Sequence, residues 1–379
     1  MNTQTKDYSL LYFTLLVCFL IFTVKAVGQN ETILNQEAEI KANQLLKQTV
    51  DKKIFTGVAA GISIQENRVW LKAAGHSDKA TNKTMDIQTI TRTASIAKSM
   101  TAIAVIQLVE QGLLDLDAPI QTYIPDYPKK KAGTITTRHL LYQTAGIPNY
   151  KSIKEVENTK AFPTLSDAVD VFKNRDLTHQ PGTAFSYATY NYVVLGLIIE
   201  KVSGVTYEAY MTKNIWEKAG MQHTGVEKYK SQYANKSSLY HRNKKGKIKF
   251  ANKANDLSNR IPGGGFYSCV ADLLRFGEAV INNELISAES LQMMLTKSNV
   301  EKAGNPYGMG WFMYGEAGNQ NGCFGHSGEQ TGVSAQLMII PSRETVVVVM
   351  ANTSGSWKEA IQLSVELLNL SKEVKKTGE

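Results

Sequence analysis

The chain has 379 residues, a formal net charge of +8, 43% hydrophobic residues and 20% charged residues. This composition is ordinary for a globular protein, and the length suffices for one large domain or two lobes. The basic excess lies in short clusters at residues 129–131, 244–247 and 372–376, with no aromatic residues between the charges. The pattern excludes a nucleic-acid surface of the usual kind, although the charge would favour loose association with an anionic cell envelope.

The N-terminus has a pattern typical of a signal peptide. Lys6 precedes an uncharged run, residues 10–24, that is short for a membrane span, and small residues at positions 26–28 suit cleavage. We therefore expect residues 1–28 to be removed and the protein to be exported, to a periplasm or out of the cell. An uncleaved membrane anchor is the alternative.

The first predicted strands are residues 57–65 and 68–74, which flank a two-residue turn at Glu66-Asn67 and indicate a hairpin. The N-terminal part of the chain therefore supplies strands to a sheet.

Ser95 and Lys98 open the most apolar helix that the sequence predicts. Residues 100–109 are apolar on nearly every side, and Gly112 is a suitable C-terminal cap. Ser95 and Lys98 therefore share one face in the first turn of a buried helix. A serine hydroxyl needs a neighbouring base to become a nucleophile, and a buried lysine can lose its proton. The pattern favours a catalytic pair, with a serine that merely caps the helix as the alternative.

The middle of the chain has little strand character and carries helical patterns near 99–111, 137–143, 166–174, 191–203, 207–219, 270–282 and 287–296. The C-terminal part predicts a second hairpin, residues 333–341 and 345–352, and then a helix over residues 357–370. We expect an α/β fold of the α+β type. An antiparallel sheet built from both chain ends would be flanked by helices, with a mostly helical lobe beside it.

Two further segments carry reactive side chains. Tyr187 lies in a loop before a predicted buried helix, where its phenol can reach a cleft. His326 lies in the sequence Gly-His-Ser-Gly at residues 325–328, directly before the C-terminal hairpin. Cys269 and Cys323 are expected to be free buried thiols, with a disulfide between them as the alternative.

In this order, Ser-x-x-Lys, a loop tyrosine and His-x-Gly resemble the serine β-lactamase and penicillin-binding-protein family. The resemblance is to class C β-lactamases and to related esterases and D-Ala-D-Ala carboxypeptidases, and it covers residues 54–370. It implies one catalytic domain, residues 29–379. The α/β lobe would comprise residues 36–90 and 289–370, and the helical lobe residues 91–288.

The resemblance also implies a role for each reactive residue. Ser95 would attack a carbonyl carbon and become acylated, and Lys98 would keep a basic partner deprotonated. Tyr187 would act as general base and then as acid toward the leaving group. The backbone N–H groups of Ser95 and Glu329 would form the oxyanion hole. The resemblance implies no metal and no cofactor.

Four residues are expected to bind substrate: Thr189, His326, Ser327 and Gly328. Thr189 stands where the family most often has asparagine, and a hydroxyl cannot supply both the donor and the acceptor of a carboxamide. Glu329 adds a carboxylate that would repel anionic substrates, and β-lactams and D-Ala-D-Ala peptides are anionic. Both departures disfavour β-lactam turnover.

We therefore expect an exported serine hydrolase that forms an acyl-enzyme with an ester or a D-amino-acid peptide or amide. Its partner would be a small-molecule or peptide substrate. The alternative is a non-catalytic or slowly deacylating penicillin-binding protein that senses the state of the envelope. Intact Ser95, Lys98 and Tyr187 favour the enzyme, because a binder needs no proton relay.

Overall fold

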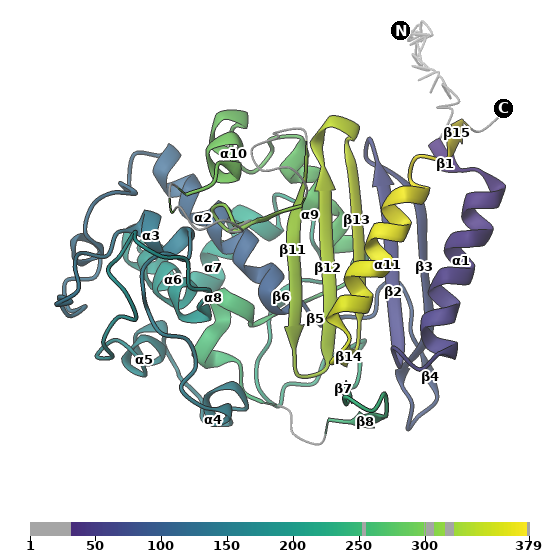
Figure 1. Cartoon of the computed structure of the whole chain (residues 1–379), viewed down its shortest axis with the longest axis horizontal. Helices are drawn as coiled ribbons and strands as arrows, with labels where there is room; N and C mark the ends of the chain where they lie inside the picture. The colour runs from purple at the N-terminus through teal and green to yellow at the C-terminus, as the bar shows by residue number, and fades with distance from the viewer. Residues whose placement is uncertain (1–31, 252–254, 299, 301–306, 315–321, 377–379) are drawn as a thin grey trace, which may run out of the picture.

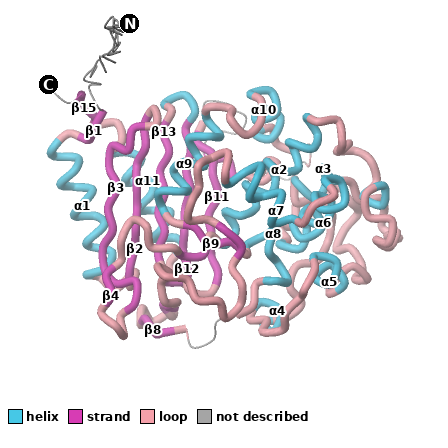
Figure 2. Tube along the Cα trace, turned by 180° about the vertical axis from the view of Figure 1, so that it is seen from behind, coloured by secondary structure: helices cyan, strands magenta, loops and turns pink. Residues whose placement is uncertain are grey.

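The structure, a computed structural model, describes residues 32–251, 255–298, 300, 307–314 and 322–376 (Figure 1). A large antiparallel sheet lies beside a mostly helical part, and Figure 2 shows the strands gathered on one side of the molecule. The expected mixed fold of sheet and helices is therefore confirmed. The predicted signal peptide, residues 1–28, lies outside the described residues, and export stays a prediction.

The large sheet of the described residues has the strand order β10-β11-β12-β13-β2-β3-β4. Strands from the two ends of the chain meet inside it, where β13 runs antiparallel to β2 and Ala351 lies opposite Val58. The strands are β2 (Gly57–Ile64), β3 (Asn67–Asp78), β4 (Lys83–Thr84), β10 (Phe312–Tyr314), β11 (Cys323–Gln330), β12 (Val333–Ile340) and β13 (Thr345–Ala351). A separate pair, β1 (Thr32–Leu34) and β15 (Val374–Lys376), lies at the edge of the molecule.

The turn between β2 and β3 lies one residue earlier than expected. Gln65 and Glu66 have φ angles of 50° and 62°, as a tight hairpin turn requires, and Asn67 already belongs to β3. The reason is an irregularity in the pairing, which places Ile62 opposite Trp70 but Ile64 opposite Asn67. The predicted turn at Glu66-Asn67 is therefore wrong by one position.

Helices cover both faces of the sheet. Helices α1 (Gln36–Asp51) and α11 (Trp357–Leu370) pack on one face around an apolar core (Figure 1). Helix α9 (Val270–Ile281) packs on β2 and β13 from the other face. Although α9 falls within residues 91–288, which we expected to form the helical lobe, its apolar face covers the sheet. The layers of the fold are therefore not contiguous in sequence.

The helical part is built around α2 (Ala97–Glu110) and α6 (Thr189–Ser203), which contact each other and are buried on nearly all sides. The shorter helices are α3 (Thr137–Leu141), α4 (Ile153–Val156), α5 (Leu165–Asp170), α7 (Tyr207–Met211), α8 (Ile261–Gly264) and α10 (Ala288–Leu295). The expected lack of strands in this region is only partly right. Short strands occur there as β5 (Thr91–Arg92), β6 (Gly225–Val226), β7 (Tyr240–Arg242), β8 (Ile248–Phe250) and β9 (Phe266–Ser268), and β7 pairs with β14 (Thr353–Ser354).

Two expectations concern the environment of the protein. Cys269 and Cys323 are both free thiols, Cys269 buried and Cys323 partly exposed, so the expectation of full burial holds for Cys269 alone. In the part of the chain that the structure describes, no helix combines the length and the apolar character that crossing a bilayer requires.

Candidate active site

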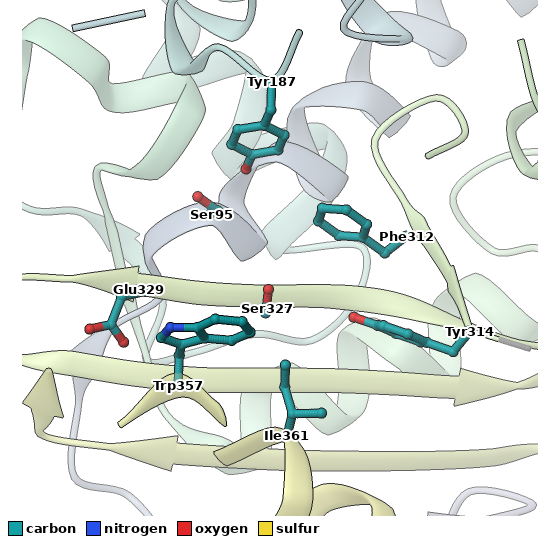
Figure 3. A pocket seen from close by; sticks show the side chains of 8 residues that line it. All are labelled: Ser95, Tyr187, Phe312, Tyr314, Ser327, Glu329, Trp357 and Ile361. Carbon is teal, nitrogen blue, oxygen red and sulfur yellow. The ribbon is translucent and has the colours of Figure 1, made fainter. Parts of the chain in front are cut away.

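Ser95 lies in a short 3-10 turn, η1 (Ala94–Ile96), that leads directly into α2. Its neighbours Ala94 and Ile96 are buried, whereas Ser95 is partly exposed and lines a pocket (Figure 3). Ala94 has a φ of 47°, a left-handed conformation that costs energy for any residue with a Cβ atom. Strained backbone of this kind is typical of functional sites, and here it immediately precedes the predicted nucleophile.

Strand β11 approaches η1 closely because Gly328 has no side chain. A Cβ atom at Gly328 would lie 2.3 Å from the backbone oxygen of Thr93. Gly328 is therefore a spacing residue that allows β11 to lie against the turn carrying Ser95. Gly328, which we expected to bind substrate, thus contributes through the close packing of two backbone segments and not through a side chain.

Lys98 is fully buried and contacts three uncharged oxygen atoms. Its Nζ lies 3.0 Å from Ser95 Oγ, 2.6 Å from the backbone oxygen of Gly263 and 3.4 Å from Thr189 Oγ1. Burial, and to a smaller extent the positive charge of Arg260, hold the pKa of Lys98 well below its usual value. The lowered pKa makes the ammonium proton of Lys98 easier to lose, and the neutral amine could accept the proton of Ser95.

The hydroxyl of Tyr187 points toward Ser95 from the opposite side of the pocket (Figure 3). The Lys98 Nζ lies 5.0 Å from the centroid of the Tyr187 ring. Burial, with a smaller effect from Tyr307, raises the pKa of Tyr187 well above its usual value. The phenol therefore keeps its proton, which suits a proton donor better than the general base that the resemblance implied.

Gln143 fastens the loop that carries Tyr187. Its side-chain Oε1 accepts hydrogen bonds from the backbone N–H of Ala188 at 3.0 Å and from Asn191 Nδ2 at 2.5 Å. Its backbone oxygen accepts a third from the N–H of Ser186 at 2.8 Å. Sequence reasoning assigned no role to Gln143, which follows the end of α3 by two residues and is fully buried.

Thr189 and His326 do not line the pocket. Thr189 opens α6 and contacts Lys98, while its N–H donates to Asn149 Oδ1 at 3.2 Å. His326 is fully buried, with Nδ1 2.7 Å from the backbone oxygen of Ser327 and Nε2 3.2 Å from the hydroxyl of Tyr307. Burial is the main cause that lowers the pKa of His326 to about 3, and a proton on Lys98 would act in the same direction, so the ring is neutral. The expected direct contact of both side chains with substrate has no support in this geometry.

Tyr307 is a residue that sequence reasoning missed. Its ring packs edge-on against the ring of Tyr187, with centroids 5.9 Å apart and an interplanar angle of 88°. His326 contacts the Tyr307 hydroxyl and also packs edge-on against the ring of Phe312, with centroids 5.0 Å apart, so it supports the pocket from behind. No motif around Tyr307 singles it out in the sequence.

The register of β11 and β12 orients the N–H of Glu329. A two-residue turn closes on Gln330 and Val333, so the next pair, Glu329 and Ser334, is one whose backbone groups do not bond each other. The Glu329 N–H must then point away from β12, toward the edge of β11 that packs on η1. The backbone direction agrees with the predicted oxyanion hole.

The side chain of Glu329 lines the pocket and is held by two hydrogen bonds. Its carboxylate accepts from Ser334 Oγ at 2.7 Å and from the backbone N–H of Gly355. Although Glu329 as a whole residue is exposed, partial desolvation of its carboxyl group raises its pKa to about 7, and these two donors act in the opposite direction. The negative charge that the sequence predicted near the site is therefore present mainly above neutral pH.

The pocket has a volume of about 580 Å³ and opens directly on Ser95, Tyr187 and Ser327 (Figure 3). Its remaining surface is an apolar wall of four side chains, which we call the aromatic wall: Phe312, Tyr314, Trp357 and Ile361. Two of these come from β10 and two from α11. Sequence reasoning missed all four, since neither element carries a recognisable motif.

A family model described as Beta-lactamase matches residues 42–368. The chain belongs to the beta-lactamase family. Its members are serine hydrolases, and the order of Ser95, Tyr187 and His326 along this chain is the one that the resemblance required. The expected family is therefore confirmed.

Relatives of this beta-lactamase family member come from distant organisms. The human serine beta-lactamase-like protein LACTB, mitochondrial, is 28% identical over 393 aligned residues, which cover 79% of this chain and 71% of that protein. The putative penicillin-binding protein PbpX of Bacillus subtilis is 28% identical over 333 residues, covering 87% and 80%.

Solved structures agree on the fold. A penicillin-binding protein from Bacillus halodurans matches with a TM-score of 0.74 at 25% identity, covering 86% of this chain and 98% of that one. A D-amino acid amidase from Ochrobactrum anthropi has a TM-score of 0.77 at 22% identity, covering 89% and 98%. At that identity the amidase supports the fold alone.

Proposed function

We propose that this protein is a serine hydrolase that cleaves an ester or a D-amino-acid peptide or amide through an acyl-enzyme on Ser95. One observation carries the proposal. Ser95 Oγ lies between a buried lysine whose pKa is lowered and a partly buried tyrosine whose pKa is raised, at the mouth of a pocket. Titratable groups whose pKa values move in opposite directions are typical of an acid–base pair.

Acylation follows from these protonation states. Ser95 Oγ attacks the carbonyl carbon of the substrate, and its proton passes to neutral Lys98. As the bond from that carbon to the leaving oxygen or nitrogen breaks, Tyr187 donates its proton to the leaving atom and regains one from Lys98. Water then attacks the acyl-enzyme and gives up a proton, by way of the same two side chains, to Ser95 Oγ as its C–O bond breaks, which releases a carboxylic acid and restores the Ser95 hydroxyl.

The oxyanion that forms on the carbonyl oxygen needs two N–H donors. Those of Ser95 and Glu329 suit this role, since η1 and the edge of β11 lie against each other. Loss of one such donor typically costs about 3–4 kcal/mol of transition-state stabilisation. Because both donors are backbone groups, the spacing set by Gly328 matters more than any side chain here.

Two features argue against efficient β-lactam turnover. Thr189 has a hydroxyl in place of a carboxamide, and that hydroxyl contacts Lys98, so it cannot bind a substrate amide as an asparagine side chain would. Among the described residues that line the pocket, Glu329 is the one with a carboxyl group, and it would repel a substrate carboxylate above neutral pH. We place the enzyme in a periplasm or outside the cell, on the sequence pattern of residues 1–28.

A fluorophosphonate probe tests the nucleophile. Ser95→Ala should abolish covalent labelling while the protein stays folded, and Ser152→Ala, which changes an exposed serine elsewhere, should leave labelling unchanged. Undiminished labelling of the Ser95→Ala variant would refute the assignment. Turnover of an acyl ester distinguishes the enzyme from the alternative penicillin-binding sensor, which would release one equivalent of product and then stop.

A further inference from the structure

The pocket beside Ser95 has apolar residues on one side and polar residues on the other. The aromatic wall forms one side, while Ser95, Tyr187, Ser327 and Glu329 supply the polar atoms. Among the described residues that line it, none is a lysine or arginine. The pocket can therefore desolvate an apolar group well, and it offers no cation to a carboxylate.

The aromatic wall is presented to the pocket by two different elements (Figure 3). The Phe312 ring stacks on the ring of Tyr187, with centroids 6.1 Å apart and an interplanar angle of 19°. The Tyr314 hydroxyl is occupied by Gln336 Nε2 at 2.9 Å, which leaves its ring free for apolar contact. Trp357 lies in the first turn of α11 and is 42% exposed, and Ile361 follows one turn later.

The position of Tyr187 indicates which half of the substrate enters this space. In the reaction proposed above, the atom that leaves the carbonyl carbon takes its proton from the Tyr187 hydroxyl. Tyr187 lines the pocket and stacks on Phe312, so the departing group would have the aromatic wall next to it.

In the part of the chain that the structure describes, the charges around the wall do not form a site for a carboxylate. Lys358 is exposed, and its Nζ lies 5.7 Å from the centroid of the Trp357 ring. Arg242 is paired with Glu359 at 2.9 Å. Glu329, which lines the pocket itself, is acidic.

We infer that the natural substrate carries an uncharged leaving group of about the size of an aromatic ring, and that Trp357 is the main determinant of this preference. The inference rests on the proposed function, whose acyl-enzyme and proton donor it uses. It narrows the substrate class from esters and amides in general to those whose alcohol or amine half is bulky, apolar and free of a carboxylate.

A pair of acetyl esters isolates the leaving group, since the acyl half is constant. Benzyl acetate and ethyl acetate differ only in the alcohol, and the wild type should have the higher kcat/KM for the benzyl ester. Trp357→Ala should reduce the benzyl-to-ethyl ratio of kcat/KM by about tenfold, because the indole provides a large part of the apolar contact. Trp357→Phe should restore most of the ratio. Val365→Ala, an exposed apolar residue of the same helix outside the pocket, should leave it unchanged.

A charged analogue tests the second half of the inference. The acetyl ester of 4-(hydroxymethyl)benzoate places a carboxylate on the same ring and should be a poorer substrate than benzyl acetate at pH 8.5, where Glu329 is ionised. Glu329→Gln should reduce the difference in kcat/KM between the two esters, because it removes the repelling carboxylate. Lys358→Gln should leave that difference unchanged.

The outcomes separate this inference from the proposed function. If the wild type is not labelled by the fluorophosphonate probe, the proposed function itself fails. If labelling is normal but Trp357→Ala leaves the benzyl-to-ethyl ratio of kcat/KM unchanged, the inference that the aromatic wall binds the leaving group is wrong. If the carboxylated ester is hydrolysed with the same kcat/KM as benzyl acetate, the inference that the leaving group must be free of a carboxylate is wrong. Since Trp357 is partly exposed at the start of α11, its truncation should leave the thermal unfolding midpoint nearly unchanged.

Discussion

The pKa of Lys98 is lowered and that of Tyr187 is raised, and these two shifts bear on the direction of proton transfer in the site. Both side chains lose solvation, which favours the neutral amine and the neutral phenol. The family resemblance gave Tyr187 the role of general base. The lowered pKa of Lys98 and the raised pKa of Tyr187 instead favour the proposed roles, in which Lys98 accepts the Ser95 proton and Tyr187 acts as the donor.

The pH dependence of activity should report on Lys98. Activity requires the neutral amine, so kcat/KM should rise with pH through a pKa well below 10.5, the usual value for lysine. Arg260→Met removes a nearby positive charge, which should raise the pKa of Lys98 and move this rise to higher pH. Arg260→Lys keeps the charge and should leave the profile close to that of the wild type. An unshifted profile in Arg260→Met would contradict the influence of Arg260 on Lys98.

Removal of the Tyr187 hydroxyl should affect catalysis far more than folding. Tyr187→Phe keeps the ring contacts with Tyr307 and Phe312 but deletes the transferable proton. We expect kcat to fall by about a hundredfold or more, as is typical for the loss of a general acid or base. Thermal unfolding measured on the same preparation should change little. A near-normal kcat would exclude Tyr187 from the proton path.

At the level of elements, the site depends on how closely β11 lies against η1. Gly328→Ala would place a Cβ atom 2.3 Å from the Thr93 oxygen, and the strand would have to move away from Ser95. We expect kcat for an acyl ester to fall by more than about tenfold, because the oxyanion donors separate. Gly264→Ala is a matched control, since its new Cβ atom would meet Ala94 at an ordinary 3.6 Å. Equal activities of the two variants would contradict this spacing role.

Gln143 connects two further elements, the end of α3 and the loop before α6. Gln143→Met removes the acceptor for the Ala188 N–H and Asn191 Nδ2, both of which are buried. Burying donors without partners should lower the free energy of unfolding by about 2 kcal/mol. Because Tyr187 directly precedes Ala188, kcat should fall more than KM rises, and steady-state kinetics beside chemical denaturation would measure both effects. Gln180→Met, in the exposed loop upstream, is the control.

Elements with one strong local signal were predictable from the sequence. Helix α2 and the hairpin of β12 and β13 have unbroken apolar runs, and Ser95 and Lys98 lie at a fixed spacing in one turn. Helix α1 was not predicted because its buried stripe consists of small or isolated residues, Ala38, Ala42 and Leu46, in an otherwise polar segment. The aromatic wall could not be predicted, since Phe312 and Trp357 come together only through the packing of α11 beside the sheet.

At the level of the whole molecule, a buried ion pair connects the start of the helical part to the sheet. Arg92 is fully buried, and it bonds both carboxylate oxygens of Glu227 and the backbone oxygen of Thr331 in the turn between β11 and β12. Burial alone would raise the pKa of Glu227, but Arg92 and Lys236 outweigh this effect and hold it below the usual value. The stabilisation is therefore present above pH 4.5 and is lost as the pH falls through the lower pKa of the folded state.

Arg92→Met should leave the Glu227 carboxylate buried with Lys236 as its remaining ion-pair partner. We expect the free energy of unfolding at pH 7 to fall by about 3–5 kcal/mol, measured by denaturant titration. Below pH 4.5 the difference between variant and wild type should shrink, because protonated Glu227 no longer needs the guanidinium. A difference that is constant from pH 7 to pH 3 would contradict this account.

The pairing of β2 with β13 also has a kinetic consequence. Val58 and Ala351 are neighbours in the sheet although almost the whole chain separates them in sequence. During synthesis, the first hairpin must therefore wait with an unpaired edge until the last strands have been made, and long-range pairing of this kind slows folding. Until then the apolar strand edge is open to other chains, so this protein should depend on assistance from chaperones during its biogenesis more than its ordinary composition suggests.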